Sequence, residues 1–355
     1  MNWLSNFIRP KIRSLVGAQT DVPENLWHKC PACDNMIFHR ELTENIHVCH
    51  HCNFHMAISV DERLTVLFDD GEYKRHANKS VPSDPLKFKD RKKYADRLKE
   101  SRLKTHEDDA IVIATGKIGG SPVVSAVFNF KFMGGSMGAA VGEGIVVAAE
   151  LAVKTKSALI IIPASGGARM QEGAISLMQM PRTIIAVNRV KRARLPYIVL
   201  LTNPTTGGVS ASFAMVGDVH IAEPGATIGF AGKRVIQETI REELPDDFQT
   251  AEYLLEHGMV DMVVSRKDLN ETIGRILGFL MAPKIAAPKG KGKKTKKSES
   301  KASAKTDSKA NAKASAKAVV SIDTVSKKSK EMQLDAVNSE DKAAITGEVI
   351  QKKAS

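Results

Sequence analysis

The sequence predicts an α/β fold built from a repeated unit of a strand, a glycine turn and a helix. The clearest copy spans residues 157–173. Its apolar run 158–162 has the length and β-branching of a strand buried on both faces, and it ends at Pro163, which cannot donate to a sheet. A second copy spans 197–217 and a weaker one spans 123–153. Three copies of one pattern indicate internal repetition.

The glycine turns carry the candidate chemistry. Glycine lets the backbone come close to a ligand, and the helix that we expect from Ala168 onward starts with N–H groups that have no internal partner. Such N–H groups can hold an oxyanion. The alternative is that the glycine pairs only pack helices tightly against strands. We predict catalytic backbone donors at both turns, namely Gly207 and Gly208 first, then Gly166, Gly167 and Ala168.

The N-terminal segment does not look like a targeting signal. The first thirteen of the 355 residues mix apolar with basic side chains, without a long apolar core or a small-residue cleavage site. No run in the sequence reaches membrane-spanning length. We therefore expect a cytoplasmic protein without a membrane span.

All four cysteines lie in two C-x2-C pairs, Cys30 with Cys33 and Cys49 with Cys52, with fifteen residues between the pairs. This spacing places four thiolates around a tetrahedral Zn²⁺, and the metal replaces the core that so short a segment cannot build. Because four thiolates leave no open coordination position, we expect one structural zinc ion. A rubredoxin-like iron site with the same ligands stays an alternative, and two disulfides are disfavoured in a cytoplasmic chain. The nearby histidines are not favoured as ligands: His39, His47, His50, His51 and His55.

Two helices are predicted before the first repeat, and a hairpin leads into it. Residues 61–68 form an amphipathic pattern, and residues 90–105 form a strongly charged helix with a sparse apolar stripe. The charges of this second helix fit a solvated face, and contact with phosphate groups is the alternative. Residues 110–117 and 121–130 read as two strands joined at Gly119-Gly120.

Further helices are predicted at 176–194, with an interruption near Pro181, and at 250–261 and 269–280, and a strand at 219–222. The sequence around Gly142-Glu143-Gly144 lacks the third glycine of a dinucleotide fingerprint, which argues against a Rossmann site. Lys233 and Arg234 follow a glycine-containing stretch. They are candidate substrate-binding cations, and a solvated pair beside a helix is the alternative.

The C-terminal segment differs in composition from the rest. Beyond Met281 it is rich in Lys, Ala, Ser and Gly and has no aromatic residue, which predicts a disordered tail over 283–355. Residues 284–317 contain twelve lysines and two acidic residues, so they account for ten of the formal net charge of +12. A generally basic fold is therefore not indicated. A solubility spacer, a nucleic-acid contact and a protein-docking segment are all open as roles for the tail.

Three motifs connect the sequence to a family: SGGARMQEG at 165–173, NPTTGGVSASFAMVGD at 203–218 and EPGATIGFAG at 223–232. With the four-cysteine motif, they resemble the carboxyltransferase β subunit of bacterial acetyl-CoA carboxylase over residues 1–282. The resemblance implies a crotonase-like (ClpP/crotonase) α/β core of repeated β-β-α units, in which paired N–H groups stabilise enolate-type oxyanions. We divide the chain into an N-terminal segment with a zinc ribbon (1–57), a carboxyltransferase domain (58–282) and a disordered basic tail (283–355), which departs from the usual family pattern.

The resemblance also implies a reaction and partners. A carboxyl group moves from carboxybiotin, on a biotin carboxyl carrier protein, to acetyl-CoA and gives malonyl-CoA. A related α subunit completes the site in an α2β2 heterotetramer, and biotin carboxylase is a further partner. The biotin anion can remove the proton of the acetyl methyl group, so fixed N–H donors suffice without a protein base.

Two other functions stay open at this point. Another crotonase-type acyl-CoA enzyme, such as a hydratase or a decarboxylase, needs placed carboxylates, and Glu143 and Glu172 are the candidates beside the glycine turns. Both are also explained as ordinary helix residues. A nucleic-acid-binding protein would instead use the zinc ribbon and the lysine-rich tail to bind phosphate.

Overall fold

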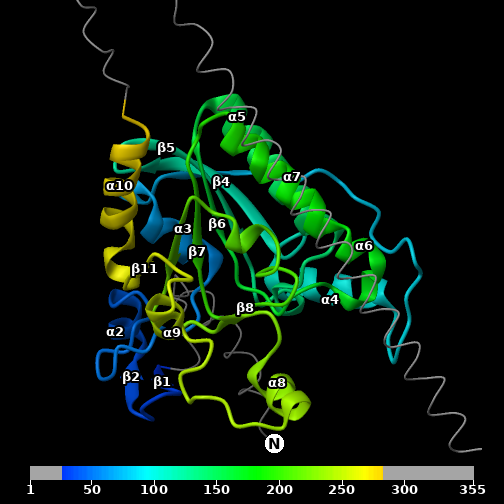
Figure 1. The fold of residues 1–355 in the computed structure, drawn as a ribbon, viewed down its shortest axis with the longest axis horizontal. Coiled ribbons are helices and arrows are strands. Elements are labelled where there is room, and N and C mark those ends of the chain that lie inside the picture. Colours follow the sequence, from blue (N-terminus) through cyan, green and yellow to red (C-terminus); the bar gives the residue numbers. More distant parts are fainter. Residues whose placement is uncertain (1–25, 283–355) are drawn as a thin grey trace, which may run out of the picture. The chain divides into compact units, whose positions relative to one another are not determined.

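The computed structural model describes residues 26–282, which belong to one compact unit (Figure 1). The predicted tail 283–355 and the first 25 residues lie outside the described residues. The domain boundary that we predicted between residues 57 and 58 lies inside this unit, and it stays a prediction. The core is a seven-stranded sheet in the order β11-β9-β7-β6-β5-β4-β3. Its strands are β3 (Tyr73–His76), β4 (Ile111–Ile118), β5 (Ser121–Phe128), β6 (Ala158–Ile162), β7 (Tyr197–Leu201), β9 (Val219–Ala222) and β11 (Met262–Val263).

The sheet begins antiparallel and continues parallel. Strands β3, β4 and β5 pair antiparallel, and β5, β6, β7, β9 and β11 follow in parallel. The predicted hairpin is confirmed at Gly119 and Gly120, which have φ values of 55° and 75°. These left-handed conformations favour glycine. The two N–H groups donate to the two carboxylate oxygens of Asp69 at 2.9 and 2.8 Å, which anchors the turn.

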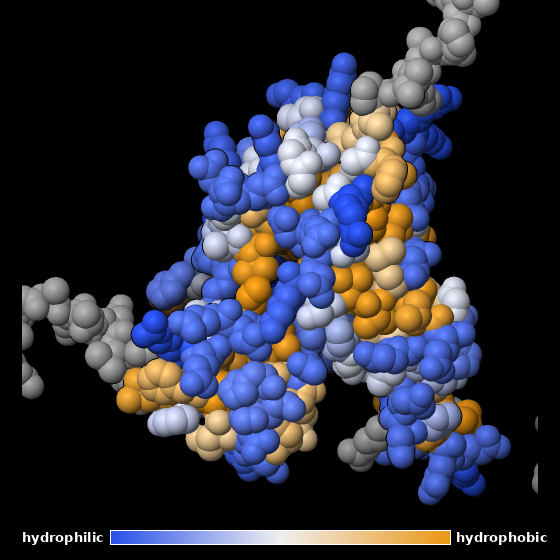
Figure 2. Space-filling view, turned by 90° about the vertical axis from the view of Figure 1, so that its left-hand side faces the viewer, coloured by the Kyte–Doolittle hydropathy of each residue, from blue (hydrophilic) through white to orange (hydrophobic). Residues whose placement is uncertain are grey.

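The sheet is buried on both faces, which explains why β6 and β7 are apolar at every position. Side chains alternate along β6. Leu159 packs with α5 (Ala139–Thr155) and α7 (Gln179–Arg192), and Ile160 packs with α3 (Val60–Leu67) and α10 (Leu269–Leu280). In Figure 1, α10 therefore lies on the opposite side of the sheet from α5 and α7. On the face that carries α10, hydrophobic residues reach the surface between hydrophilic ones (Figure 2).

Short stretches after the long strands form a second stack. Met137 forms a parallel bridge with Ala168, and Ser165 forms one with Thr205. The next pair of this stack is β8 (Thr205–Thr206) with β10 (Ile228–Gly229), again parallel. Each repeat thus gives one long strand to the main sheet and one short stretch to the stack. This confirms the repeated β-β-α organisation and brings the glycine turns next to one another.

Two predicted helices are absent at the glycine turns. No α-helix starts at Ala168; the chain continues through the 3₁₀ turn η3 (Met170–Glu172) to α6 (Ala174–Leu177). After Gly208 the structure contains turns and η4 (Phe213–Met215) in place of the helix that the second copy of the repeated unit (197–217) predicted. Here Ser210 donates to the carbonyls of Gly207 and Gly229 at 2.9 and 2.7 Å. Serine side chains of this kind compete with the backbone hydrogen bonds of a helix.

Other helices differ from prediction mainly in extent. The charged helix is α4 (Tyr94–Thr105), and the helix predicted at 250–261 is the shorter α9 (Ala251–Glu256). The interruption predicted near Pro181 falls at Met178, between α6 and α7. The remaining elements are α8 (Lys233–Ile240), β1 (Trp27–Lys29), β2 (Met36–Phe38), α2 (His39–Glu44), η1 (Asp69–Gly71), η2 (Met133–Gly135) and η5 (Arg266–Asp268). None of the helices in the described part of the chain is long and apolar enough to cross a membrane.

The ribbon is fastened to the sheet by Arg266, which is 3% exposed. Its guanidinium donates to the carbonyls of Ile46 and Met56 at 2.9 and 3.1 Å, and to both carboxylate oxygens of Glu223 at 2.8 and 2.9 Å. Arg63 also donates to Glu223, at 2.8 Å. Burial alone raises the pKa of Glu223, but the two arginines hold it well below its usual range. The ribbon therefore docks through a buried, fully paired carboxylate.

Candidate active site and metal centre

The four cysteines form a cluster that can hold one metal ion. The Sγ atoms of Cys30, Cys33, Cys49 and Cys52 lie within 4.8 Å of one another. The Cys30–Cys52 and Cys33–Cys49 pairs are 3.7 and 3.8 Å apart. A tetrahedral ion with metal–sulfur bonds of about 2.3 Å requires sulfur–sulfur distances of about 3.8 Å. The predicted ligands therefore fit a structural zinc ion, and four thiolates leave no position for a substrate.

The charges of this cluster also call for a cation. A hydrogen bond from the backbone of Asn35 lowers the pKa of the Cys33 thiol to about 7. The pKa of the Cys52 thiol is raised to about 12. A hydrogen bond from the backbone of Phe54 lowers this pKa, but burial and the other three cysteines together raise it by more. Thiolates this close together repel one another, and Zn²⁺ supplies the compensating positive charge when bound.

The histidines near the ribbon make other contacts. Among residues 26–282, the cluster of metal-ligating groups consists of the four cysteines without a histidine. His47 Nε2 lies 2.9 Å from a carboxylate oxygen of Glu62. His55 Nε2 accepts the backbone N–H of Arg266 at 3.2 Å, and burial lowers the pKa of His55. These two histidines therefore join the ribbon to α3 and to η5.

The two main glycine turns touch each other. A Cβ atom on Gly207 would lie 3.0 Å from the Cα of Gly167, and one on Gly208 would lie 3.8 Å from the Cβ of Ala168. Gly167 and Gly207 also have φ values of 115° and 65°. At Gly207 both the close approach and the backbone conformation favour glycine, and at Gly167 the backbone conformation favours it.

The predicted donors differ in whether their N–H groups are already bonded. Three bind acceptors within the chain: Gly166 binds the Gly134 carbonyl at 3.0 Å, Gly167 binds Ser165 Oγ at 3.0 Å, and Gly207 binds the Phe230 carbonyl at 2.9 Å. Among the described residues, the N–H groups of Ala168 and Gly208 donate no hydrogen bond. The geometry thus favours Ala168 and Gly208 over the other three as oxyanion donors.

Ala168 borders a cavity of about 550 Å³ between the glycine turns and α4. The other walls include Phe130, Met133 and Gly134 after β5, Gly166 at the turn, and Arg97, Glu100 and Ser101 on α4. The Nε atom of Arg97 is buried without an acceptor, and Nη2 of the same side chain donates to Asp90 at 2.6 Å. The Arg97 side chain therefore lines the same cavity as Ala168, with its Nε atom shielded from solvent.

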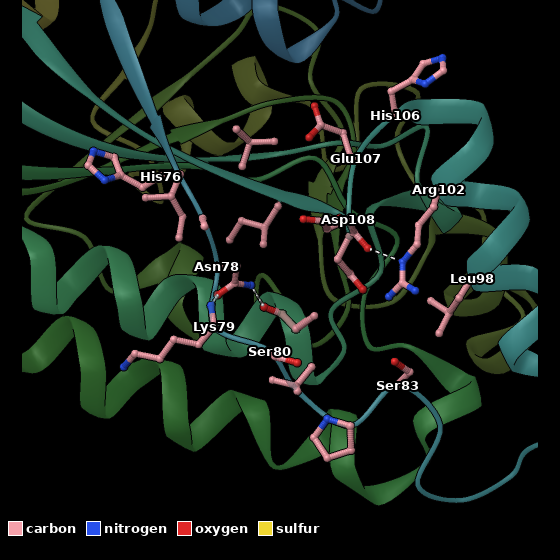
Figure 3. Close-up of a pocket in the computed structure, with 18 of the residues that line it drawn as sticks. His76, Asn78, Lys79, Ser80, Ser83, Leu98, Arg102, His106, Glu107 and Asp108 are labelled. Atoms are coloured by element: carbon pink, nitrogen blue, oxygen red, sulfur yellow. Dashed lines mark hydrogen bonds between the residues drawn. The ribbon is translucent and has the colours of Figure 1, made fainter.

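A larger cavity of about 680 Å³ lies between the segment that follows β3 and the end of α4 (Figure 3). His76, Asn78, Lys79, Arg102, Glu107 and Asp108 are among its lining residues. Asn78 donates to the Ala140 carbonyl at 2.7 Å, and Arg102 donates to the Asp108 carbonyl at 2.9 Å. No residue of the two main glycine turns lines this cavity. Although this cavity is the larger of the two, the candidate active site is the cavity that Ala168 lines.

The two carboxylates considered for hydratase chemistry are both engaged. Glu172 accepts the Tyr94 hydroxyl at 2.6 Å and the backbone N–H of Ala139 at 2.6 Å. Glu143 pairs with Arg182. Both glutamates are buried. These contacts explain them as structural groups and leave neither free to act as a general base.

The predicted substrate-binding cations lie at the start of α8. Lys233 Nζ donates to the carbonyls of Pro245 and Asp246 at 2.5 and 3.3 Å. The side chain of Arg234 lies outside the described residues. Lys233 lines neither cavity described above. Substrate binding by this pair stays a prediction without structural support.

Sequence reasoning missed the buried polar group beneath the glycine turn. Arg169 is fully buried and pairs with Asp109, at 2.6 Å. The signal in the sequence was an arginine directly after Gly166-Gly167-Ala168, a position that we expected to be the first turn of a helix. Its partners come from distant parts of the chain, so no local pattern could identify them.

Two family descriptions match the chain. "Carboxyl transferase domain" matches residues 81–320, and "Acetyl-CoA carboxylase zinc finger domain" matches residues 27–52. The acetyl-coenzyme A carboxylase carboxyl transferase subunit beta of Mesorhizobium japonicum is 59% identical over 281 residues, which cover 79% of this chain and 91% of that protein. The protein of the same name from Granulibacter bethesdensis is 60% identical over 280 residues, with 79% and 91% covered.

Solved structures of related fold extend the comparison. A transcarboxylase 12S with hydrolysed methylmalonyl-coenzyme A bound has a TM-score of 0.50 and 26% identity, covering 62% of this chain and 41% of that chain. The present chain thus matches less than half of the transcarboxylase chain. A Pseudomonas malonate decarboxylase hetero-tetramer in complex with malonate has a TM-score of 0.50 and 22% identity, covering 63% and 82%. At that identity the likeness concerns the fold alone.

Proposed function

This chain belongs to the carboxyl transferase family, among the beta subunits of acetyl-CoA carboxylase, and on that premise we propose how its glycine turns serve the transfer of a carboxyl group to acetyl-CoA. The N–H groups of Ala168 and Gly208 hold carbonyl oxygens on which negative charge develops. One observation carries this proposal. These two N–H groups lack an internal acceptor, although they lie on touching turns, and Ala168 lines a cavity.

The reaction explains why backbone donors are sufficient. Loss of a proton from the methyl group of a thioester moves negative charge onto the thioester oxygen. Fixed N–H groups aimed at that oxygen stabilise it without reorganisation, and removal of one such donor typically costs about 10²–10³ in rate. Carboxybiotin on a carrier protein supplies the carboxyl group. The contribution of this chain is to hold the oxygens and to place the acyl group.

The serines at the turns do not serve as nucleophiles in this proposal. Ser165 Oγ accepts the N–H of Gly167 at 3.0 Å, and Ser210 and Ser212 donate to backbone carbonyls. In the described part of the chain, none of these hydroxyls is hydrogen-bonded to a histidine or a carboxylate. We expect Ser165→Ala, Ser210→Ala and Ser212→Ala each to retain much of the transfer activity. A covalent acyl-serine intermediate, detected by mass spectrometry, would contradict the mechanism.

The 550 Å³ cavity is the proposed place for acyl-CoA. Ala168 lines the cavity on the side of the turns, and Arg97 lines it from α4. The Arg97 guanidinium, as a cation lining the cavity, can pair with an anionic group of coenzyme A. This favours the contact with phosphate groups that the sequence left as the alternative to a solvated face for the charged helix. Arg97→Gln should therefore raise the KM for acyl-CoA more than it lowers kcat.

The α subunit is the proposed partner at this site. Large apolar side chains beside the glycine turns are exposed, namely Met170 (74%), two residues after Ala168, and Phe230 (69%), whose carbonyl accepts from Gly207. Exposed groups of this kind, close to polar ones, fit a surface that another subunit covers. We further propose that a biotin carboxyl carrier protein delivers biotin here and that biotin carboxylase belongs to the same assembly.

The test is carboxyl transfer from malonyl-CoA to biotin, measured for this chain alone, for the α subunit alone and for the two together. We expect activity in the mixture and none in either chain by itself, because each supplies part of the site. Full activity of this chain alone would refute the two-subunit site. No activity in a stable complex of the two would refute the proposed function.

A further inference from the structure

We propose that Arg169 is a positioning residue that fixes the direction of the Ala168 N–H. This inference rests on the proposed function, because it concerns the same N–H group. Arg169 follows Ala168 directly in the chain and is 0% exposed. Arginine is rarely buried to this extent unless its charge is paired. Its contacts reach four segments that are distant from one another in the sequence.

One edge of the guanidinium is held by three side chains, from before β4, from α4 and from η3. Asp109, just before β4, accepts from Nη2 at 2.6 Å and from Nη1 at 3.0 Å. Nη1 also lies 3.1 Å from the hydroxyl of Tyr94, at the start of α4, and 3.4 Å from Glu172. A two-pronged pairing of this kind fixes the plane of the guanidinium as well as its charge.

The other edge holds the segment that follows η2. Arg169 Nε donates to Ser136 Oγ at 3.2 Å, and Nη2 donates to the Ser136 carbonyl at 2.9 Å. The backbone N–H of Arg169 donates to the carbonyl of Met137 at 2.9 Å. Arg169 therefore binds residues 136 and 137 with its side chain and its backbone together.

This segment determines how the peptide between Gly167 and Ala168 is turned. The N–H of Met137 donates to the Gly167 carbonyl at 2.8 Å. A trans peptide is planar, and its C=O and N–H groups point in opposite directions. The Ala168 N–H therefore points away from Met137. The bonds from Arg169 to Ser136 keep Met137 in register for this contact.

The experiment uses the complex with the α subunit and compares two buried arginines. Arg169→Lys keeps the positive charge but loses the planar guanidinium that donates to several acceptors at once. The kcat for carboxyl transfer should therefore fall by about tenfold or more, and the KM for malonyl-CoA should stay within about twofold of wild type. Arg266→Lys is the matched control. Arg266 is also buried and pairs with both oxygens of Glu223, but it contacts the ribbon. It should lower the melting temperature and leave kcat within about twofold of wild type.

Ser136→Ala provides a milder variant if Arg169→Lys does not fold. It removes the hydroxyl that accepts from Nε and leaves the pair with Asp109 intact, so kcat should fall by about threefold with little change in melting temperature. Unchanged kcat in the folded Arg169→Lys complex, or in Ser136→Ala where that complex does not fold, overturns the proposal. The proposal is also overturned if Arg266→Lys loses as much kcat as Arg169→Lys while the two variants have the same melting temperature. Both results require an active wild-type complex, whereas an inactive wild-type complex refutes the proposed function itself.

Discussion

Gly207 is the position at which a single added methyl group tests the proposed site most directly. A Cβ atom there would lie 3.0 Å from the Cα of Gly167, a backbone atom that cannot rotate away. Alanine would also have to adopt the φ of 65° that Gly207 now has. Gly207→Ala therefore pushes on the turn that presents the Ala168 N–H, and Gly207→Val pushes harder.

The expected cost has two parts that can be separated. The left-handed backbone costs about 1–2 kcal/mol of stability for an alanine. The contact with Gly167 must open by a few tenths of an ångström, which displaces the oxyanion donors, and for Gly207→Val we expect a loss of about 100-fold in transfer. Gly208→Ala should lose less, because its Cβ would meet the Sδ atom of Met180 at 2.9 Å, and a thioether can move.

Gly225 offers a matched control for this experiment. Its φ of 67° is nearly that of Gly207, but a Cβ atom there would have no described neighbour within 4 Å. Gly225→Ala should thus show the backbone cost in its melting temperature and retain transfer. The assay is malonyl-CoA-dependent carboxyl transfer to biotin in the complex with the α subunit, with zinc content measured in parallel. Equal activity of Gly207→Ala and Gly225→Ala would refute the reasoning.

Three further predictions concern the ribbon and the tail. Cys30→Ala should release one zinc ion per chain, measured by metal analysis, and leave the sheet folded; four freely reactive thiols in the wild-type protein would contradict this. Glu223 has a lowered pKa in the folded protein, so the stability that it contributes is present above the unfolded pKa of about 4.3 and is lost as the pH falls below that value. Melting temperatures should therefore drop more steeply with acid in the wild type than in Glu223→Gln, and parallel curves would exclude this role. Deletion of residues 284–355 should leave carboxyl transfer nearly intact and remove any strong salt-dependent binding to nucleic acid, as measured by titration against salt; loss of transfer would show that the tail is needed for catalysis.

The sequence by itself determined the features that depend on neighbouring residues. The spacing of Cys30, Cys33, Cys49 and Cys52 identified the metal ligands, because the ligand geometry is local to each C-x2-C pair. The apolar runs identified the buried strands, and Gly119-Gly120 identified the hairpin, because strand burial and turn conformation leave direct marks in composition. The glycine turns were also located correctly along the chain.

Only the tertiary structure decided which N–H groups at those turns are free. Gly207 was predicted as a donor to substrate, but its N–H is bound to the carbonyl of Phe230, which reaches it because β10 pairs with β8. The helix expected at Ala168 is absent because residues 167–169 pair with Met137 and the side chain of Arg169 is buried against Asp109. Contacts between such distant segments follow from the packing of the repeats on one another, and a local sequence pattern does not contain that information.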